Sequence, residues 1–298
     1  MTAVPAPVSA RSALRKRSKQ TSRNKEDRLR AVFLLCFFSV LWYNAHMGFT
    51  LFSGEHIEYL RHGVGVVVSP AHTFGTDALL LADFAAPKPK TRACDLGTGC
   101  GIIPLFWKSR GLCGFADGVE LQEAAASQFA RGICGSGLTD SLAAHCADLK
   151  DVGAFLRRGS YDLVTMNPPY KAENAGLKST DMSARIARHE THCTLDDIAR
   201  AASLLLRSGG RFCICLRPER LCDAMHAMRC YRLEPKRLRL VAKNAESAPW
   251  LCLLEGRRDG KSGLQILPGL FLYTKDGALC AEMQRLQQPY SEQGGADG

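Results

Sequence analysis

The sequence predicts a doubly wound α/β fold, in which helices cover both faces of a mostly parallel sheet. From residue 90, short apolar runs alternate with segments of helical periodicity, and a glycine-rich turn and a double-proline turn each follow one of these runs. The 298 residues are 46% hydrophobic and 23% charged, which suits a globular protein and excludes disordered and collagen-like classes.

Seven strands are expected in this sheet, at 91–95, 113–119, 141–146, 161–166, 211–216, 235–243 and 250–256. Helices are expected at 102–110, 122–131, 150–157, 194–207 and from Pro218 to about Met228. The helix at 194–207 has chemical signals at both ends, since Thr194 is a typical N-cap and the helix is expected to stop at Arg207-Ser208-Gly209-Gly210. Together these elements predict one domain over 47–298.

Residues 1–46 differ in composition from that domain. They hold nine Lys or Arg and two acidic residues, a net +7 of the total +10, so the domain itself carries only +3. The apolar stretch at 31–43 is shorter than the roughly 20 residues that span a membrane, and the charged segment before it is too long for a signal peptide. We expect an N-terminal extension, either upstream of a true start at Met47 or used for targeting. The domain is expected to be cytoplasmic, without stable membrane association.

The 13 cysteines include no Cys-x-x-Cys pair. This excludes a zinc ribbon, and the cysteine content is too low for a disulfide scaffold. Cys213 and Cys215 are two residues apart in an apolar run, which places both thiols on one face of a strand. We interpret the cysteines as reduced packing residues and expect no bound metal.

A glycine-rich turn follows the first predicted strand and contains Asp95, Gly97, Gly99 and Gly101. Glycines at a strand-to-helix turn allow positive φ angles and a close approach of the backbone to a ligand. Asp95 would repel a pyrophosphate but would attract a cation. S-adenosylmethionine, which carries an ammonium and a sulfonium, fits this turn better than a dinucleotide does.

Acidic residues also follow the next two strands. Glu120 can accept two hydrogen bonds from ribose hydroxyls, and Asp148 is placed to reach the edge of an adenine. Three acidic residues at successive strand ends favour a ligand site over a turn without function.

The fourth strand ends in Asn167-Pro168-Pro169-Tyr170. The two prolines fix a rigid turn, which holds the Asn167 amide oxygen and the Pro168 carbonyl as two neighbouring acceptors. Two acceptors on a conjugated amino group favour a pyramidal nitrogen whose lone pair can attack a methyl group. Tyr170 offers a face on which a flipped base can stack.

These motifs, in this order, resemble the class I S-adenosylmethionine-dependent methyltransferases that act on exocyclic or amide nitrogen. The stretches FGTDALLL (74–81), ARHE (187–190), LLLRSGGRFCICLRPERL (204–221) and LFLYTKDGALCAEM (270–283) narrow the resemblance to the bacterial tRNA(Val) adenine-37 N6-methyltransferase family. The resemblance covers about residues 47–285. It implies a Rossmann-like seven-stranded sheet, S-adenosylmethionine as cofactor and an RNA substrate.

The resemblance also implies a role for each motif. Thr76 and Asp77 would lie near the methionine end of the cofactor, although the same pair can simply be a helix N-cap with an acidic first turn. Asp95 and the glycines would hold the amino acid portion, Glu120 the ribose and Asp148 the adenine, while Asn167 to Tyr170 would hold the target amine. A phosphate-binding rim can be formed by Lys171, Lys178, Arg185 and Arg188.

The leading hypothesis is therefore an RNA adenine N6-methyltransferase that acts on tRNA next to the anticodon. Glutamine N5-methylation of release factors is the alternative with the same chemistry, because an amide nitrogen needs the same two acceptors. That family usually carries an N-terminal helical domain of some 70 residues, whereas about 45 residues of the domain precede Asp95 here. A second alternative is an inactive cofactor- or RNA-binding module, which the intact Asp95, Glu120 and Asn167 disfavour.

Overall fold

The computed structural model describes residues 42–43, 48–168 and 193–287. The chain divides into two compact units, Met1–Tyr43 and Asn44–Gly298. A short strand, β1 (Trp42–Tyr43), belongs to the first unit, and the other elements within the described residues belong to the second. Within the described residues, no helix combines the length and the apolar character needed to cross a membrane.

A nine-stranded sheet forms the centre of the second unit, with the strand order β12-β10-β11-β9-β8-β5-β6-β7 and β13 beside β10. Its strands are β5 (Arg92–Leu96), β6 (Phe115–Glu120), β7 (Leu142–Cys146), β8 (Tyr161–Met166), β9 (Leu206–Leu216), β10 (Leu233–Ala242), β11 (Leu251–Arg258), β12 (Gln265–Ile266) and β13 (Leu270–Phe271). Strands β5 to β9 run parallel, whereas β11 is antiparallel to both of its neighbours. The seven predicted strands are confirmed, and β12 and β13 are two-residue additions at the edge.

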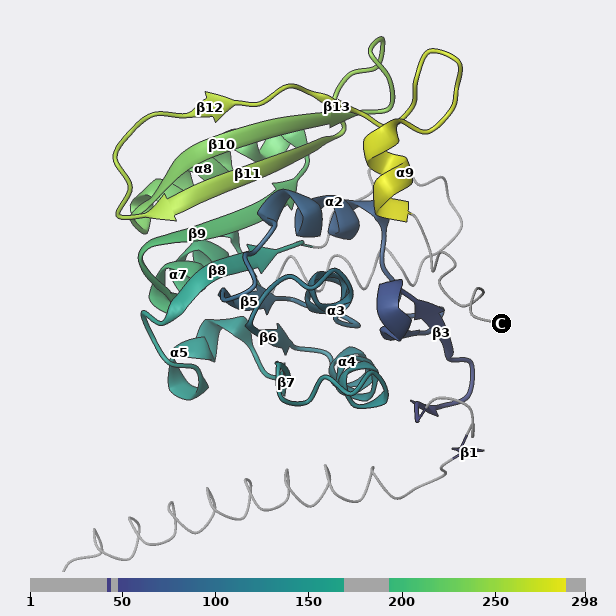
Figure 1. Ribbon diagram of the computed structural model, residues 1–298. Helices are drawn as coiled ribbons and strands as arrows, with labels where there is room; N and C mark the ends of the chain where they lie inside the picture. The colour runs from purple at the N-terminus through teal and green to yellow at the C-terminus, as the bar shows by residue number, and fades with distance from the viewer. Residues whose placement is uncertain (1–41, 44–47, 169–192, 288–298) are drawn as a thin grey trace, which may run out of the picture. The chain divides into compact units, whose positions relative to one another are not determined.

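Helices cover both faces of the sheet, as predicted (Figure 1). One face packs against α2 (Thr76–Ala85), α3 (Ile102–Ser109) and α4 (Glu123–Gly135), and the other against α5 (Val152–Phe155), α7 (Leu195–Leu205) and α8 (Leu221–Cys230). The C-terminal α9 (Ala281–Gln287) adds Met283 and Leu286 to the first core. The doubly wound fold class is therefore confirmed.

A short hairpin precedes α2. After β2 (Thr50–Leu51), strands β3 (His56–Tyr59) and β4 (Gly65–Val68) pair in antiparallel fashion, and β4 packs against α4. Arg131 of α4 holds this region through a two-point ion pair with Glu55 and a hydrogen bond to the Thr50 carbonyl. Helix α4 continues to Gly135 rather than ending at 131 as predicted, and Ile133 of this last turn is buried in the core.

The predicted end of α7 is wrong. Helix α7 starts at its predicted Thr194 cap, whose hydroxyl accepts the Asp197 N–H, but it ends at Leu205 rather than at Arg207–Gly210. Residues 207–210 instead form a bulge at the start of β9, because Tyr161 pairs with Leu206 while Leu163 pairs with Arg211. The glycines permit this kink in a strand as readily as a helix stop.

The segments at 150–157 and 218–228 contain tighter turns than the predicted helices. Leu149–Asp151 forms a 3₁₀ turn before the single turn of α5. Pro218–Arg220 forms another one before α8, and the three residues Arg61–Gly63 form a third between β3 and β4. Proline is well placed at Pro218, because the first residue of a helical turn needs no N–H partner.

Candidate functional site

The candidate site lies at the carboxyl ends of β5, β6 and β8. Strand β5 is flanked by β6 on one side and by β8 on the other, so the strand order reverses at β5. In open α/β sheets this reversal leaves a crevice beyond the strand ends, and ligands bind there. The structure therefore brings the predicted glycine turn and Asn167 to the same edge of the sheet.

The glycine turn connects β5 to α3 and uses its three glycines differently. All three have positive φ angles, of 61°, 57° and 81° for Gly97, Gly99 and Gly101. A Cβ at Gly101 would lie 1.8 Å from the Phe129 ring, so this residue is required for packing. A Cβ at Gly99 would have no atom within 4 Å, which leaves open space beside the backbone for a ligand.

Asp95 is buried at the end of β5, where its side chain is 1% exposed. Thr165 occupies the matching position on β8 and donates a 2.6 Å hydrogen bond from its hydroxyl to Asp95 Oδ1. Burial raises the pKa of Asp95 from 3.8 to about 7, and the Thr165 hydrogen bond opposes this rise. Burial therefore disfavours the ionised carboxylate, and a cation beside Asp95 would stabilise that form.

Glu120 ties the glycine turn to the end of β6. Its Oε2 accepts the Gly99 N–H at 2.9 Å, and its Oε1 accepts the Gln122 N–H at 2.8 Å. Each carboxylate oxygen keeps a second lone pair, so both remain able to accept hydrogen bonds from a diol. Glu120 thus shapes the loop in addition to offering the predicted acceptors.

Asp148 follows β7 and acts as the N-cap of the next 3₁₀ turn. Its Oδ1 accepts the Lys150 N–H at 2.9 Å, and its Oδ2 lies 3.3 Å from Lys150 Nζ. The predicted role of Asp148 at an adenine edge stays a prediction. The local capping contact is the role that its geometry displays.

Asn167 follows the end of β8, and its side chain contacts the start of α2. Its Nδ2 donates a 3.0 Å hydrogen bond to Asp77 Oδ2 in the first turn of α2, and its Oδ1 accepts one from the Cys215 thiol at 3.0 Å. The structure thus brings together Asp77 and Asn167, which are 90 residues apart in sequence. Thr76 is the first helical residue after the N-cap Gly75, so the N-cap interpretation of Thr76 is wrong, whereas Asp77 does lie in the first turn.

Sequence reasoning missed Thr165 and Cys215 as members of the site. Thr165 precedes Asn167 by two residues in β8, a spacing that puts both side chains on the face carrying Asp95. Cys215 was placed on a strand face with Cys213 but interpreted only as packing. Pro168 is described at the end of this turn, whereas Pro169, Tyr170 and the predicted rim Lys171, Lys178, Arg185 and Arg188 lie outside the described residues.

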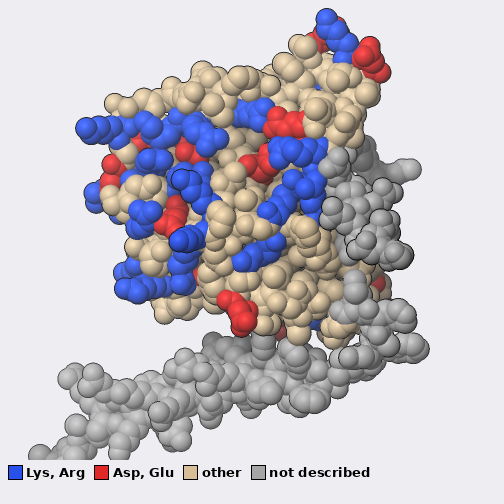
Figure 2. All heavy atoms as spheres, viewed as in Figure 1, with Lys and Arg blue, Asp and Glu red and all other residues tan. Residues whose placement is uncertain are grey.

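Figure 2 shows Lys and Arg side chains gathered where β9 begins and β11 ends. This is the amino edge of the parallel strands, opposite to the candidate site. Several of these side chains are paired with acids, since Arg211 and Arg237 contact the buried Glu255 and Arg207 contacts Asp162. Among the described residues, no group of three His, Cys, Asp or Glu side chains is arranged to hold a metal ion.

The chain is similar to curated tRNA1(Val) (adenine(37)-N6)-methyltransferases. It is 34% identical to the protein of Dickeya chrysanthemi (strain Ech1591) over 143 residues, which are 48% of this chain and 55% of that relative. It is 27% identical to the protein of Porphyromonas gingivalis (strain ATCC 33277) over 225 residues, which are 72% of this chain and 87% of that relative. The chain thus spans about half the length of the first of these relatives. No protein-family model matches it.

Among solved structures, the chain resembles a predicted O-methyltransferase from Agrobacterium tumefaciens. The TM-score is 0.55 with 20% sequence identity, and the match covers 73% of this chain and 99% of that one. At this identity the likeness concerns the fold alone. By sequence the chain is therefore similar to the curated tRNA1(Val) (adenine(37)-N6)-methyltransferases, and it shares its fold with that predicted O-methyltransferase.

Proposed function

We propose that the chain is an S-adenosylmethionine-dependent methyltransferase that modifies the N6 amine of an adenine in RNA, with tRNA beside the anticodon as its substrate. The observation that carries this proposal is the position of Asn167, held at the end of β8 between Asp77 and Cys215, beside the glycine turn. The sequence relatives support the same substrate class through their names.

The residues at the strand ends fit the cofactor. The open space beside Gly99 admits a ligand close to the backbone, and the buried Asp95 favours a cation over an anion. Glu120 is mostly buried at 6% exposure and retains acceptor capacity for two ribose hydroxyls. S-adenosylmethionine supplies an activated methyl group, so the protein needs neither a covalent nucleophile nor a metal for the transfer.

The remaining task of the protein is to position the target amine. In this proposal, the Asn167 amide oxygen and the Pro168 carbonyl accept the two hydrogens of the amino group. These hydrogen bonds favour a pyramidal nitrogen and direct its lone pair toward the methyl group. Correct positioning of two reacting groups is by itself a large part of the catalysis of such a reaction.

Transfer of a labelled methyl group provides the test. The full chain is incubated with labelled S-adenosylmethionine and either total tRNA or a release factor, and the tRNA is then digested to nucleosides. We expect label in N6-methyladenosine. Label only in the release factor would refute the RNA assignment and indicate glutamine methylation, and absence of label in both would refute the proposed activity on either substrate.

Asn167→Ala provides the matched site test. The variant removes one acceptor for the amine but no predicted contact to the cofactor. We expect turnover to fall by about two orders of magnitude or more, with cofactor affinity within a few fold of wild type. Wild-type turnover in this variant would remove Asn167 from the mechanism.

A further inference from the structure

We infer that Asp77 is a positioning residue that fixes the orientation of the catalytic Asn167 amide, an inference that rests on the proposed function. A terminal amide can rotate by 180° about its last side-chain bond, which exchanges its oxygen with its nitrogen. Only one of these two orientations presents an acceptor to the target amine. Asp77 selects that orientation from the neighbouring helix.

The hydrogen-bond chemistry of the two neighbours is complementary. A carboxylate can only accept, so the Asn167 NH₂ group faces Asp77, with its Nδ2 3.0 Å from Oδ2. The Cys215 thiol on the other side donates to Oδ1 at 3.0 Å. Rotation of the amide would place the Asn167 oxygen against the Asp77 carboxylate, where two acceptors would repel each other.

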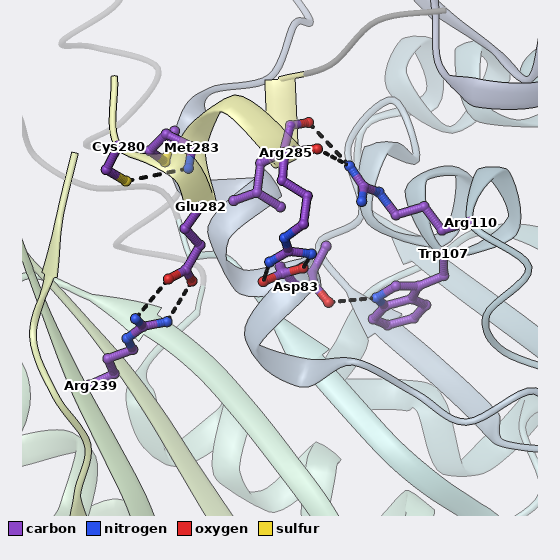
Figure 3. A network of polar contacts seen from close by, with 10 residues as sticks. Asp83, Trp107, Arg110, Arg239, Cys280, Glu282, Met283 and Arg285 are labelled. Atoms are coloured by element: carbon purple, nitrogen blue, oxygen red, sulfur yellow. Dashed lines mark hydrogen bonds and ion pairs between the residues drawn. The ribbon is translucent and has the colours of Figure 1, made fainter. Parts of the chain in front are cut away.

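The backbone around Asp77 is held firmly enough to serve this purpose. Asp77 lies in the first turn of α2, and the last turns of this helix are fixed by contacts with α3 and α9 (Figure 3). Asp83 forms a two-point ion pair with Arg285 at 3.0 and 2.9 Å, and the Ala82 carbonyl accepts the Trp107 indole N–H at 2.9 Å. These contacts anchor the last turns of α2, and its first turns are held by Ala78 and Leu81, which are buried in the core between the helix and the sheet.

This role differs from the cofactor contact predicted for Asp77 from the sequence. If Asp77 contacts the cofactor, its loss should lower the affinity for S-adenosylmethionine. If Asp77 positions Asn167, its loss should lower kcat, and only in a protein that still contains Asn167. The two interpretations can therefore be separated by measuring both quantities in the same set of variants.

The experiment compares Asp77→Ala, Asp77→Asn, Asn167→Ala and the Asp77→Ala/Asn167→Ala double variant of the full chain. We expect Asp77→Ala to lower kcat about 10- to 100-fold, the usual effect of losing one hydrogen bond to a charged group, with cofactor affinity within about threefold. Asp77→Asn keeps an acceptor and should recover most of the loss. The double variant should be no slower than Asn167→Ala alone.

Asp140→Asn is the matched control, because it removes an exposed carboxylate from the segment between α4 and β7 and leaves α2 and its anchoring contacts unchanged. Its kcat should equal that of wild type. Wild-type kcat in Asp77→Ala would overturn the inference, as would effects that multiply in the double variant. A large loss of cofactor affinity in both Asp77 variants would assign Asp77 to the cofactor instead.

A second measurement does not depend on turnover. The side-chain amide NMR signals of Asn167 are identified by their loss in Asn167→Ala, and we expect them to shift in Asp77→Ala. Unchanged signals would overturn the inference even if no methyl transfer is found. The kinetic comparison uses whichever substrate the wild-type chain methylates, so absence of label in tRNA would refute the proposed substrate and leave this contact testable.

Discussion

Replacement of Asp95 by Asn should stabilise the ligand-free protein at neutral pH and abolish cofactor binding. Burial raises the pKa of this carboxyl from 3.8 to about 7. A tenfold change in an equilibrium corresponds to about 1.4 kcal/mol, so this rise favours the protonated carboxyl by about 4 kcal/mol. Asn has nearly the same shape, and its amide oxygen can still accept the Thr165 hydroxyl.

The sign of the pH dependence follows from proton binding in the two states. Between pH 4 and 7 the unfolded chain carries an ionised Asp95, whereas the folded chain carries a protonated one. The stability that Asp95 contributes is therefore present at low pH and is lost as the pH rises through 7. Relative to Asp95→Asn, the wild-type free energy of unfolding should fall by about 2.5 kcal/mol between pH 5 and pH 8.

Urea unfolding at pH 5, 6, 7 and 8 measures this difference directly. The exposed Asp140→Asn serves as a control for the loss of one carboxylate and should follow wild type at each pH. At pH 8, cofactor at 100 times its dissociation constant should stabilise wild type by about 2.7 kcal/mol and leave Asp95→Asn unchanged. Parallel pH profiles for wild type and Asp95→Asn, or equal cofactor stabilisation of both, would refute the reasoning.

Two further predictions concern packing. In urea unfolding, Gly101→Ala should lower the free energy of unfolding by about 2–4 kcal/mol, because the new Cβ would collide with Phe129 and the residue has a positive φ. Gly99→Ala places its Cβ in open space and should cost only about 1–2 kcal/mol of backbone strain. Equal losses in the two variants would contradict the packing role of Gly101. Leu286→Ala should lower the free energy of unfolding by about 2–4 kcal/mol, because Leu286 of α9 is only 5% exposed. Glu282→Gln weakens a partly exposed ion pair with Arg239 and should lower it by less than about 1 kcal/mol. Thermal unfolding of both variants tests this order of stability.

The seven main strands and the glycine turn could be predicted because their signals are local. An apolar run of five or six residues, or three alternate glycines after an Asp, is visible in a short window of sequence. The bulge at 207–210 was not predictable in the same way. Its glycines are consistent with the end of a helix, and only the pairing of Tyr161 with Leu206 shows that this segment belongs to a strand.

The contacts that organise the candidate site are long-range. Asp77 and Asn167 each lie in a recognisable sequence motif, but the hydrogen bond between them depends on where α2 packs on the sheet. The Cys215 thiol meets Asn167 because β9 lies beside β8, a neighbour relation that no local pattern specifies. Conversely, Asp148 accepts a capping hydrogen bond from the nearby Lys150 N–H, a local contact that its position after a strand does not indicate.

The two acidic groups of the candidate cofactor site differ in what they need. Glu120 already has a backbone N–H on each oxygen, so its charge is compensated by the loop that it shapes. Asp95 has the Thr165 hydroxyl and is fully buried, so its charge is compensated only poorly before a cation arrives. Under the proposed assignment, in which Glu120 binds ribose and Asp95 the amino acid portion, the ribose side would be organised before binding, whereas Asp95 would become ionised when the cation binds. A buried carboxylate lowers the stability of the free protein, and the same destabilisation increases the affinity for a cationic ligand that relieves it.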